Sequence, residues 1–183
     1  EKIVTLDNKD VDLDSETLVI ADEEGPLAIA GVKGGKRAEV NTETKNLFLE
    51  SANFDASSVR QTSTRLNIKT SASKRFESNL TPELAGEAMD TFSYFIAQVA
   101  KSAVFGGSND IYKKKQKPTV LNIKTDQIRE TLGSTIEDAD IVACLSKLQI
   151  VAEIKKDKLV VSVPAIRNDL KIPEDIIEEV GRI

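Results

Sequence analysis

One carboxylate, a glycine-rich turn and a loop of small side chains are the parts of this sequence whose residue types and spacing could do chemistry. Glu50 follows the apolar run LFL at 47–49, downstream of the turn AGVKGG that contains Gly31 and Gly34. A carboxylate in such a position either faces solvent or lies in a buried pocket, where it needs a hydrogen-bond donor to offset the loss of water. Taken alone, the local sequence favours the solvent-facing position.

The turn holds three glycines in five residues, at Gly31, Gly34 and Gly35. Glycine permits a positive φ and lets another group come close to the backbone. The turn lacks the GK[ST] ending of a phosphate loop, so it does not predict a phosphate site of that kind. These residues are consistent with two interpretations, a structural tight turn and a backbone that contacts a ligand.

The third part is the loop IKTSAS at 68–73, whose side chains are mostly small and include Thr70 and Ala72. Five basic residues lie around it in the sequence: Arg60, Arg65, Lys69, Lys74 and Arg75. Such a cluster can bind phosphates, although it more often forms a solvated face. Phe76 is the one aromatic residue that interleaves with it, so a base-stacking surface is not indicated.

The composition narrows the class of protein. A chain of 183 residues with 40% hydrophobic residues can bury a core. Its net charge of −5 argues against a surface built around positive charge for nucleic acid, so any such contact must be local. The single cysteine excludes an intramolecular disulfide and fits a reducing cytoplasm. No run approaches the length of a membrane span, so we predict a cytoplasmic protein with no membrane partner.

The sequence contains no histidine, which removes the commonest general base and any His-dependent nucleophile or metal site. We therefore assign no catalytic residue and predict no metal site. The chain begins at Glu1 without methionine and stops at Ile183 inside a helical pattern. These ends lead us to expect an excised fragment.

The elements that must position the three parts follow from periodicity and turn residues. Over residues 1–30, short apolar runs alternate with acidic turns, which is typical of antiparallel strands. The run at 47–49 is predicted to start a buried strand. Asp55 is predicted to cap a helix that Asn67 ends in the left-handed conformation.

A long helix is predicted after Thr81, its cap, with Pro82 at the first helical position and Gly106 at the end. Its apolar residues repeat at helical spacing. This pattern predicts the core helix of the first domain.

The second half of the chain predicts a small separate domain. The polar and basic segment 108–117, which carries KKKQK, is predicted to connect a domain at 1–115 to one at 116–183. The latter has the predicted order strand, helix, helix, hairpin and helix, with the last helix starting at Pro173. Cys144 is predicted as a core residue. The predicted class is α+β: a mixed or antiparallel-sheet domain with packed helices, then a small winged-helix-like module.

Three separated motifs resemble one known family. They are LVIADEEGPLAIAGVKGG, TKNLFLESANFDASSVRQTSTRLNIKTSASKRFE and VSVPAIRNDLKIPEDIIEEVGRI, in the family's order. The family is the β subunit of bacterial-type phenylalanyl-tRNA synthetase, and the resemblance covers essentially the whole chain. It implies that residues 1–115 are the C-terminal portion of the tRNA-editing domain and that 116–183 are the winged-helix-like domain after it.

The resemblance also implies an activity and site residues. It implies a proofreading pocket that hydrolyses tRNA(Phe) mischarged with tyrosine, while the aminoacylation site lies in the other subunit. Glu50 would accept the tyrosine hydroxyl and Gly31 would offer a backbone N–H to the same group. Gly34 would line the pocket, and Thr70 and Ala72 would bring the loop to the ester and the terminal adenosine. We therefore expect Glu50 to point into a concave, largely apolar pocket.

The implied partners are the synthetase α subunit, in an α2β2 enzyme, and tRNA(Phe). No cofactor is expected for the fragment, and ATP and magnesium are implied for the whole enzyme only. The family's editing domain also has upstream residues with a histidine motif, so we expect the isolated fragment to edit weakly or not at all. The alternative is a catalytically silent module for structure, tRNA binding and assembly.

Overall fold

The structure is a computed structural model that describes residues 1–113 and 115–183. It divides into two compact units, Glu1–Ala103 (unit 1) and Val104–Ile183 (unit 2), each built from helices and antiparallel strands. The predicted α+β class is thus confirmed. The predicted boundary between 115 and 116 falls in the coil that precedes the first strand of unit 2. Of the KKKQK segment, Lys114 lies outside the described residues.

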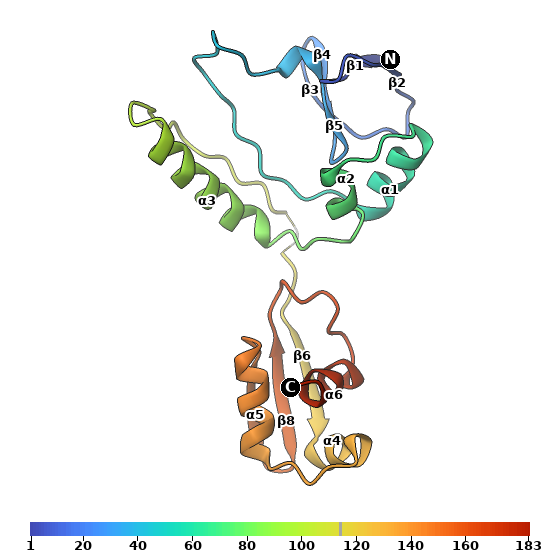
Figure 1. The fold of residues 1–183 in the computed structure, drawn as a ribbon, viewed down its shortest axis with the longest axis vertical. Coiled ribbons are helices and arrows are strands. Elements are labelled where there is room, and N and C mark those ends of the chain that lie inside the picture. The colour runs from blue at the N-terminus through green and yellow to red at the C-terminus, as the bar shows by residue number, and fades with distance from the viewer. Residues whose placement is uncertain (114) are drawn as a thin grey trace. The chain divides into compact units, whose positions relative to one another are not determined.

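Unit 1 opens with two small antiparallel sheets, as the alternation of apolar runs and turns predicts (Figure 1). One pairs β1 with β2, and the other has the order β3-β4-β5. The bounds are β1 (Lys2–Val4), β2 (Asp10–Asp12), β3 (Val19–Asp22), β4 (Gly25–Ile29) and β5 (Lys33–Gly34), followed by the short 3₁₀ helix η1 (Lys36–Ala38). The core of the unit is small and contains four buried aliphatic residues: Ile3, Ile29, Val32 and Val59.

Two helices complete this core. Asp55 caps α1 (Ala56–Arg65), because its carboxylate accepts a hydrogen bond of 2.8 Å from the N–H of Ser58. Asn67 follows with φ +52, so both predicted helix signals are confirmed. The loop prediction for 68–73 is wrong at its end, because α2 (Ser71–Phe76) begins inside it.

The predicted buried strand at 47–49 is wrong. These residues lie in coil, where Phe48 is 96% exposed and Leu47 is 56% exposed. A strand needs a neighbouring strand to satisfy its backbone hydrogen bonds. The three-stranded sheet uses β3, β4 and β5 only, so an apolar run by itself does not become a strand.

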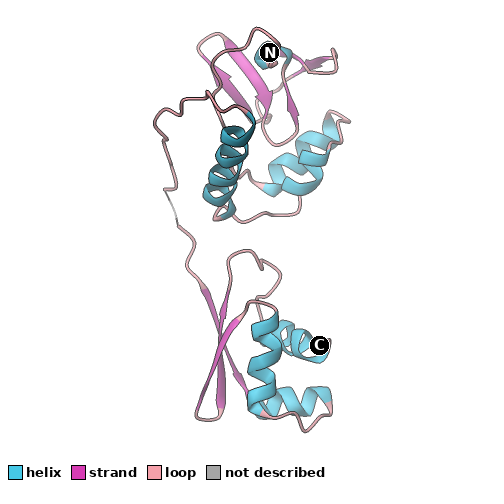
Figure 2. Ribbon diagram, turned by 60° about the vertical axis from the view of Figure 1, so that its left-hand side comes forward, coloured by secondary structure: helices cyan, strands magenta, loops and turns pink. Residues whose placement is uncertain are grey.

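The prediction of a core helix after Thr81 is also wrong in its packing. The helix α3 (Leu84–Val99) starts two residues after Pro82, ends well before Gly106 and has no buried residue. It is joined to the preceding coil by the Ser51 hydroxyl, which donates to the Ala85 carbonyl at 2.7 Å. The unit's core is closed by the sheets and α1 instead. Figure 2 shows α3 as a separate rod beside the sheets.

Unit 2 has the predicted order of elements and one continuous core. Its antiparallel sheet has the order β6-β8-β7, and three helices cover one face (Figure 1). The bounds are β6 (Thr119–Lys124), α4 (Thr125–Leu132), α5 (Asp138–Lys147), β7 (Val151–Lys155), β8 (Lys158–Val163) and α6 (Pro173–Gly181). Cys144 is half-buried rather than part of the buried core, because Ile141 and Leu145 take the inward positions of α5.

A buried carboxylate fastens the last helix. Glu179 of α6 is 6% exposed. The Nη2 atom of Arg167 donates to its Oε1 at 2.7 Å, and the Nη2 atom of Arg182 donates to its Oε2 at 2.6 Å. These hydrogen bonds, that of Arg167 first, lower the pKa of Glu179 from its usual value. The carboxylate is thus held charged in a buried place because two guanidinium groups pair with it.

Candidate functional site

The turn between β4 and β5 presents an unused backbone donor. The N–H of Val32 donates to the carbonyl of Ile29 at 2.9 Å, which closes a four-residue turn with Gly31 at its third position and φ +67. The N–H of the third residue takes no part in such a turn. Within the described residues, Gly31 N–H has no hydrogen-bond acceptor. It is therefore available to a ligand oxygen.

Side chains pack closely beneath this turn and require glycine there. A Cβ atom on Gly31 would lie 3.0 Å from Phe54 Cδ2, 3.0 Å from Val59 Cγ2 and 3.3 Å from Phe76 Cδ2. Phe54 and Phe76 meet edge to face, with ring centroids 5.0 Å apart. The aromatic pair and Val59 thus form a support that fixes the backbone of the turn.

Thr70 ties the start of α2 to the same turn. Its hydroxyl donates to the carbonyl oxygen of Val32 at 2.7 Å and accepts from the N–H of Ser73 at 3.0 Å. The Ser73 hydroxyl accepts from Thr70 N–H at 2.9 Å, which completes a capping box. Gly31 and Thr70, selected from separate stretches of sequence, are therefore joined through Val32.

Gly34 and Ala72 lie at the edges of this arrangement. A Cβ atom on Gly34 would lie 2.9 Å from Leu6 Cδ1, and Leu6 N–H donates to Gly34 O at 3.0 Å. Gly34 is thus packed against the segment after β1. Ala72 is exposed in the first turn of α2.

Glu50 lies in the coil before α1 and its side chain is exposed. The solvent-facing position that the local sequence favours is the one observed, and it differs from the expected position inside a concave pocket. Neighbouring atoms still withdraw the carboxyl partly from water, because desolvation raises the pKa of Glu50 above its usual value. Its role in a pocket stays a prediction.

Most of the basic side chains near the loop contact unit 1 itself. The contacts are Arg60 Nη2 to Glu77 O at 3.3 Å, Lys69 Nζ to Glu77 Oε2 at 3.0 Å and Arg65 Nη2 to Asp14 Oδ1 at 2.9 Å. Lys74 and Arg75 are exposed on α2. The partners of the first three lie 17, 8 and 51 positions away, so the basic pattern alone does not distinguish a phosphate site from these contacts.

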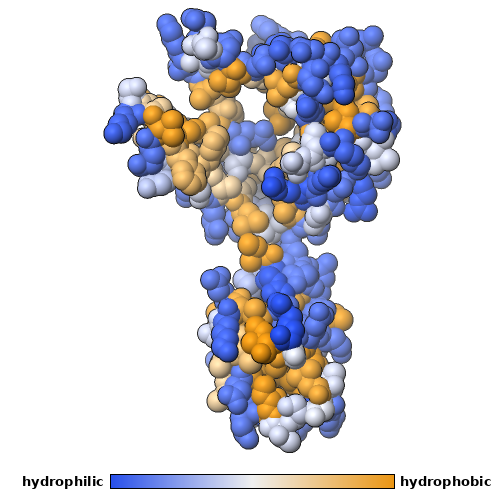
Figure 3. Space-filling view, in the orientation of Figure 1, coloured by the Kyte–Doolittle hydropathy of each residue, from blue (hydrophilic) through white to orange (hydrophobic). Residues whose placement is uncertain are grey.

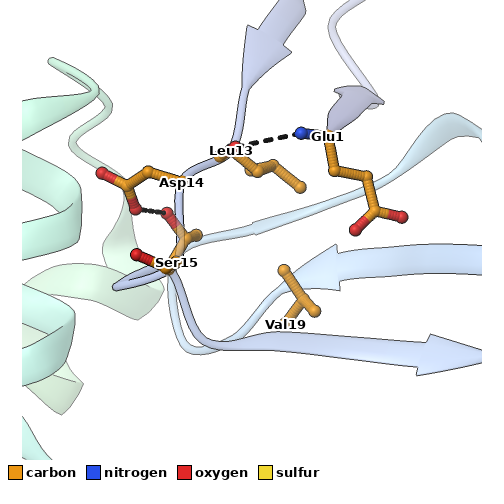
Figure 4. Close-up of a pocket in the computed structure, with 6 residues that line it drawn as sticks. Glu1, Leu13, Asp14, Ser15 and Val19 are labelled. Atoms are coloured by element: carbon orange, nitrogen blue, oxygen red, sulfur yellow. Dashed lines mark hydrogen bonds between the residues drawn. The ribbon is translucent and has the colours of Figure 1, made fainter.

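A shallow cavity lies elsewhere in unit 1, beside the chain's first residue. It has a volume of about 290 Å³ and is lined by Glu1, Leu13, Asp14, Ser15, Thr17 and Val19 (Figure 4). The amino group of Glu1 donates to Leu13 O at 3.2 Å at its side. None of the predicted site residues lines this cavity.

Unit 2 carries a row of lysines that the sequence analysis missed. The register pairs Lys124 with Lys158 and Lys155 with Lys158, so one lysine from each strand stands side by side. All three are exposed, on the face opposite buried Leu159. The alternation of lysine and apolar residues at the strand ends could have indicated that each lysine faces outward. That the three lysines form a row depends on the register between the strands.

In residues 1–113 and 115–183, there is no cluster of three or more histidine, cysteine or acidic side chains that could hold a metal ion. Over the same residues, every helix falls short of the length and apolarity that crossing a membrane requires.

Comparison with known proteins decides the family. A model described as the B3/4 domain matches residues 1–101, and one described as the tRNA synthetase B5 domain matches residues 121–183. The chain is 38% identical over 182 residues to a protein of Carboxydothermus hydrogenoformans named phenylalanine–tRNA ligase beta subunit. The chain belongs to the family of phenylalanine–tRNA ligase β subunits.

Other members of the β-subunit family are similar to the chain over its whole length. The chain is 34% identical over 183 residues to the relative of that name in Clostridium tetani and 37% identical to one in Staphylococcus aureus strain N315. Each match covers 100% of the chain and 23% of the relative. A crystal structure of an N-terminal fragment of the phenylalanyl-tRNA synthetase beta subunit from Pyrococcus horikoshii is 28% identical. It covers 38% of this chain and 20% of that chain, with a TM-score of 0.35.

Proposed function

We propose that unit 1 carries part of a proofreading site that hydrolyses tyrosyl-tRNA(Phe). The observation that supports this most is the free N–H of Gly31, held by close packing and joined to Thr70 through Val32. A rigid backbone donor that no internal acceptor uses is a recognition element for a ligand oxygen.

In this proposal, selectivity comes from the tyrosine hydroxyl. The hydroxyl accepts from Gly31 N–H and donates to the Glu50 carboxylate, while Gly34 lines the pocket. Phenylalanine lacks the hydroxyl and would leave both partners unpaired. A site that buries the partners of a hydroxyl can reject the analogue without it by roughly 10⁴-fold or more, which requires that Glu50, exposed in this chain, be covered from water in the complete subunit. Glu50 would accept this hydrogen bond in its ionised form, which desolvation disfavours because it raises the pKa of Glu50 above its usual value.

The loop with Thr70 and Ala72 would hold the ester and the terminal adenosine. Hydrolysis adds water across the ester: its oxygen joins the carbonyl carbon, the ribose oxygen leaves and takes a proton, and free tyrosine is released. Thr70 positions the loop, because its hydroxyl is occupied by Val32 O and Ser73 N–H. We assign no residue to activate the water.

The test measures deacylation of tyrosyl-tRNA(Phe) by the two-subunit enzyme and by the same enzyme with Glu50→Ala. We expect at least a tenfold loss of editing in the variant, with aminoacylation unchanged. Glu43→Ala, which removes an exposed carboxylate from the same coil, should leave both activities unchanged. Equal clearance of the mischarged tRNA by Glu50→Ala and the parent would refute the role of Glu50.

A second measurement concerns this chain alone. We infer that the 183-residue chain edits weakly, because the proposed site needs residues from the rest of the β subunit. Full deacylation activity of the isolated chain would contradict that inference. The inference would be supported if the isolated chain shows no detectable deacylation while Glu50→Ala lowers editing by the two-subunit enzyme as expected.

A second candidate is a catalytically silent module that contacts tRNA, and the lysine row of unit 2 favours it. The register places the three lysines side by side, and such a row would attract a phosphate backbone and release its counterions, while the Lys155 ammonium is paired with Glu153 Oε1 at 2.5 Å. Lys158→Gln should weaken tRNA(Phe) binding by the two-subunit enzyme and reduce its salt dependence. Unchanged affinity and salt slope would remove this candidate.

As a part of a phenylalanine–tRNA ligase, the chain would work with an α subunit and tRNA(Phe) in the cytoplasm, and we propose an α2β2 enzyme. ATP and magnesium would serve aminoacylation in the whole enzyme. No step proposed for the editing site uses either.

A further inference from the structure

The helix α2 carries two cations that unit 1 does not use. Arg75 and Lys74 are exposed, and neither side chain forms a hydrogen bond or an ion pair within the described residues. By contrast, Arg60, Arg65 and Lys69 all bind groups of unit 1. Figure 3 shows hydrophilic surface over α1 and α2. A guanidinium group without an internal partner is available to an anion.

The two cations lie on opposite flanks of the helix. Ser73 is fully buried and Phe76 is half-buried beneath the turn between β4 and β5, so these residues mark the inward side of α2. Residues three positions apart are neighbours on a helix, with Cβ atoms about 5–6 Å apart, whereas residues two positions apart do not face each other. Ala72 and Arg75 therefore share one flank. Lys74 lies on the other.

Both ends of α2 are fixed to the turn that contains Gly31. At the start of the helix, the Thr70 hydroxyl donates to Val32 O at 2.7 Å. At the end, Phe76 Cδ2 would lie 3.3 Å from a Cβ atom on Gly31. The flank with Arg75 is thus held in a fixed position relative to the free N–H of Gly31.

We propose that Arg75 binds the phosphate that joins the terminal adenosine of tRNA(Phe) to the nucleotide before it. The inference rests on the proposed function, in which Ala72 lies beside the ester and this adenosine. The phosphate on the 5′ side of the adenosine is the anion of the tRNA nearest to the ester. Arg75 lies about one helical turn beyond Ala72 on the same flank, and a guanidinium group can bind a phosphate through two parallel hydrogen bonds. Arg75 thereby positions the mischarged end without taking part in proton transfer.

The test uses deacylation of tyrosyl-tRNA(Phe) by the two-subunit enzyme. We expect Arg75→Gln to raise KM about tenfold with kcat unchanged, because the contact is made equally before and during the reaction. The dependence of log kcat/KM on log salt should become shallower by about 0.7, the value for one phosphate contact in a single strand. Lys74→Gln is the matched control, because it removes the same charge from the opposite flank, and it should change neither quantity. Aminoacylation should be unchanged in both variants.

A modified substrate identifies the phosphate. In this tRNA the last internucleotide linkage is a neutral methylphosphonate. We expect the parent enzyme to lose about tenfold in kcat/KM on this substrate, and Arg75→Gln to lose nothing further, because its contact is already absent. Arg75→Lys keeps the charge without the paired hydrogen bonds and should recover part of the loss on the natural substrate.

Three results would overturn the inference. One is an unchanged KM and salt dependence in Arg75→Gln while Glu50→Ala loses editing, which would leave the proposed function standing. Equal changes in Arg75→Gln and Lys74→Gln would attribute the effect to net charge. Independent losses from Arg75→Gln and from the methylphosphonate would place Arg75 at another group. Conversely, a raised KM in Arg75→Gln with full editing by Glu50→Ala would support the Arg75 contact and refute the role of Glu50.

Discussion

The hydroxyl of Thr70 donates a hydrogen bond of 2.7 Å to the carbonyl oxygen of Val32, 38 residues earlier in the chain. This bond fixes the first turn of α2 to the turn that contains Gly31. The same hydroxyl caps α2 through Ser73 N–H. The hydroxyl oxygen of Thr70 thus both caps α2 and holds the turn of the candidate site in place.

Thr70→Val should destabilise unit 1. It keeps the shape of the side chain but removes the donor to Val32 and the helix cap, which together cost about 2 kcal/mol. Urea unfolding of the chain measures this. Thr91→Val, an exposed position on α3, is the control and should change the free energy of unfolding by less than about 0.5 kcal/mol. Equal effects would contradict a special role for the Thr70 hydroxyl.

Gly31→Ala and Gly86→Ala should act in opposite directions. At Gly31, with φ +67, the new Cβ meets Phe54 and Val59 at 3.0 Å, so a loss of about 1–3 kcal/mol is expected. Gly86 lies in α3 with nothing within 4 Å of an added Cβ, so alanine there should gain about 0.5–1 kcal/mol. The melting temperatures of both variants test this prediction. An unchanged melting temperature for Gly31→Ala would show that the turn accommodates a Cβ atom without strain.

Glu179→Gln should lower the stability of unit 2 at neutral pH and flatten its acid dependence. Because Arg167 and Arg182 lower the pKa of Glu179 in the folded state, its contribution is fully present above the unfolded value of 4.5. It is lost as the pH falls through the lower, folded value. We expect a loss of about 2–3 kcal/mol at pH 7 that shrinks in acid.

The control for this substitution is Glu178→Gln, which removes an exposed carboxylate from the same helix. Unfolding measured from pH 7 down to pH 3 should leave its profile close to that of the parent. If both variants keep the parent's slope, the acid sensitivity of unit 2 comes from other groups.

Lys158→Gln should stabilise unit 2 at low salt. Lys158 stands between Lys124 and Lys155 across the sheet, and like charges directly opposite each other destabilise strand pairs by roughly 0.2–1 kcal/mol. The gain should shrink in 1 M salt, where screening is strong. Lys117→Gln changes the net charge equally but lies in coil, so a similar gain there would attribute the effect to net charge alone.

The elements predicted correctly from the sequence depend on near neighbours. Asp55 caps α1 through a residue three positions away, and Asn67 follows the helix with its own φ value of +52. The pairing of Thr70 with Val32 could not be predicted in this way, because it depends on how the chain returns to the turn. The family resemblance selected Thr70, but it did not reveal that its hydroxyl is occupied.

Two wrong predictions have a common physical cause. The apolar periodicity from 84 to 99 and the apolar run at 47–49 each indicate an apolar surface that is more stable when buried. Neither pattern states which partner covers it, and α3 and Phe48 are exposed here. The lysine row was missed for a related reason, since register between strands is set by the whole sheet.

In unit 2 the first and last elements share one core. Ile123 of β6 packs in the same cluster as Ile176, Ile177 and Val180 of α6. A ribosome releases β6 long before α6, so the core cannot close until nearly all of the unit has left the exit tunnel. Unit 1 completes its small core by Phe76 of α2 and can fold earlier. The nascent chain would therefore carry a folded first unit ahead of an unfinished second one, whose exposed strands need protection until α6 emerges.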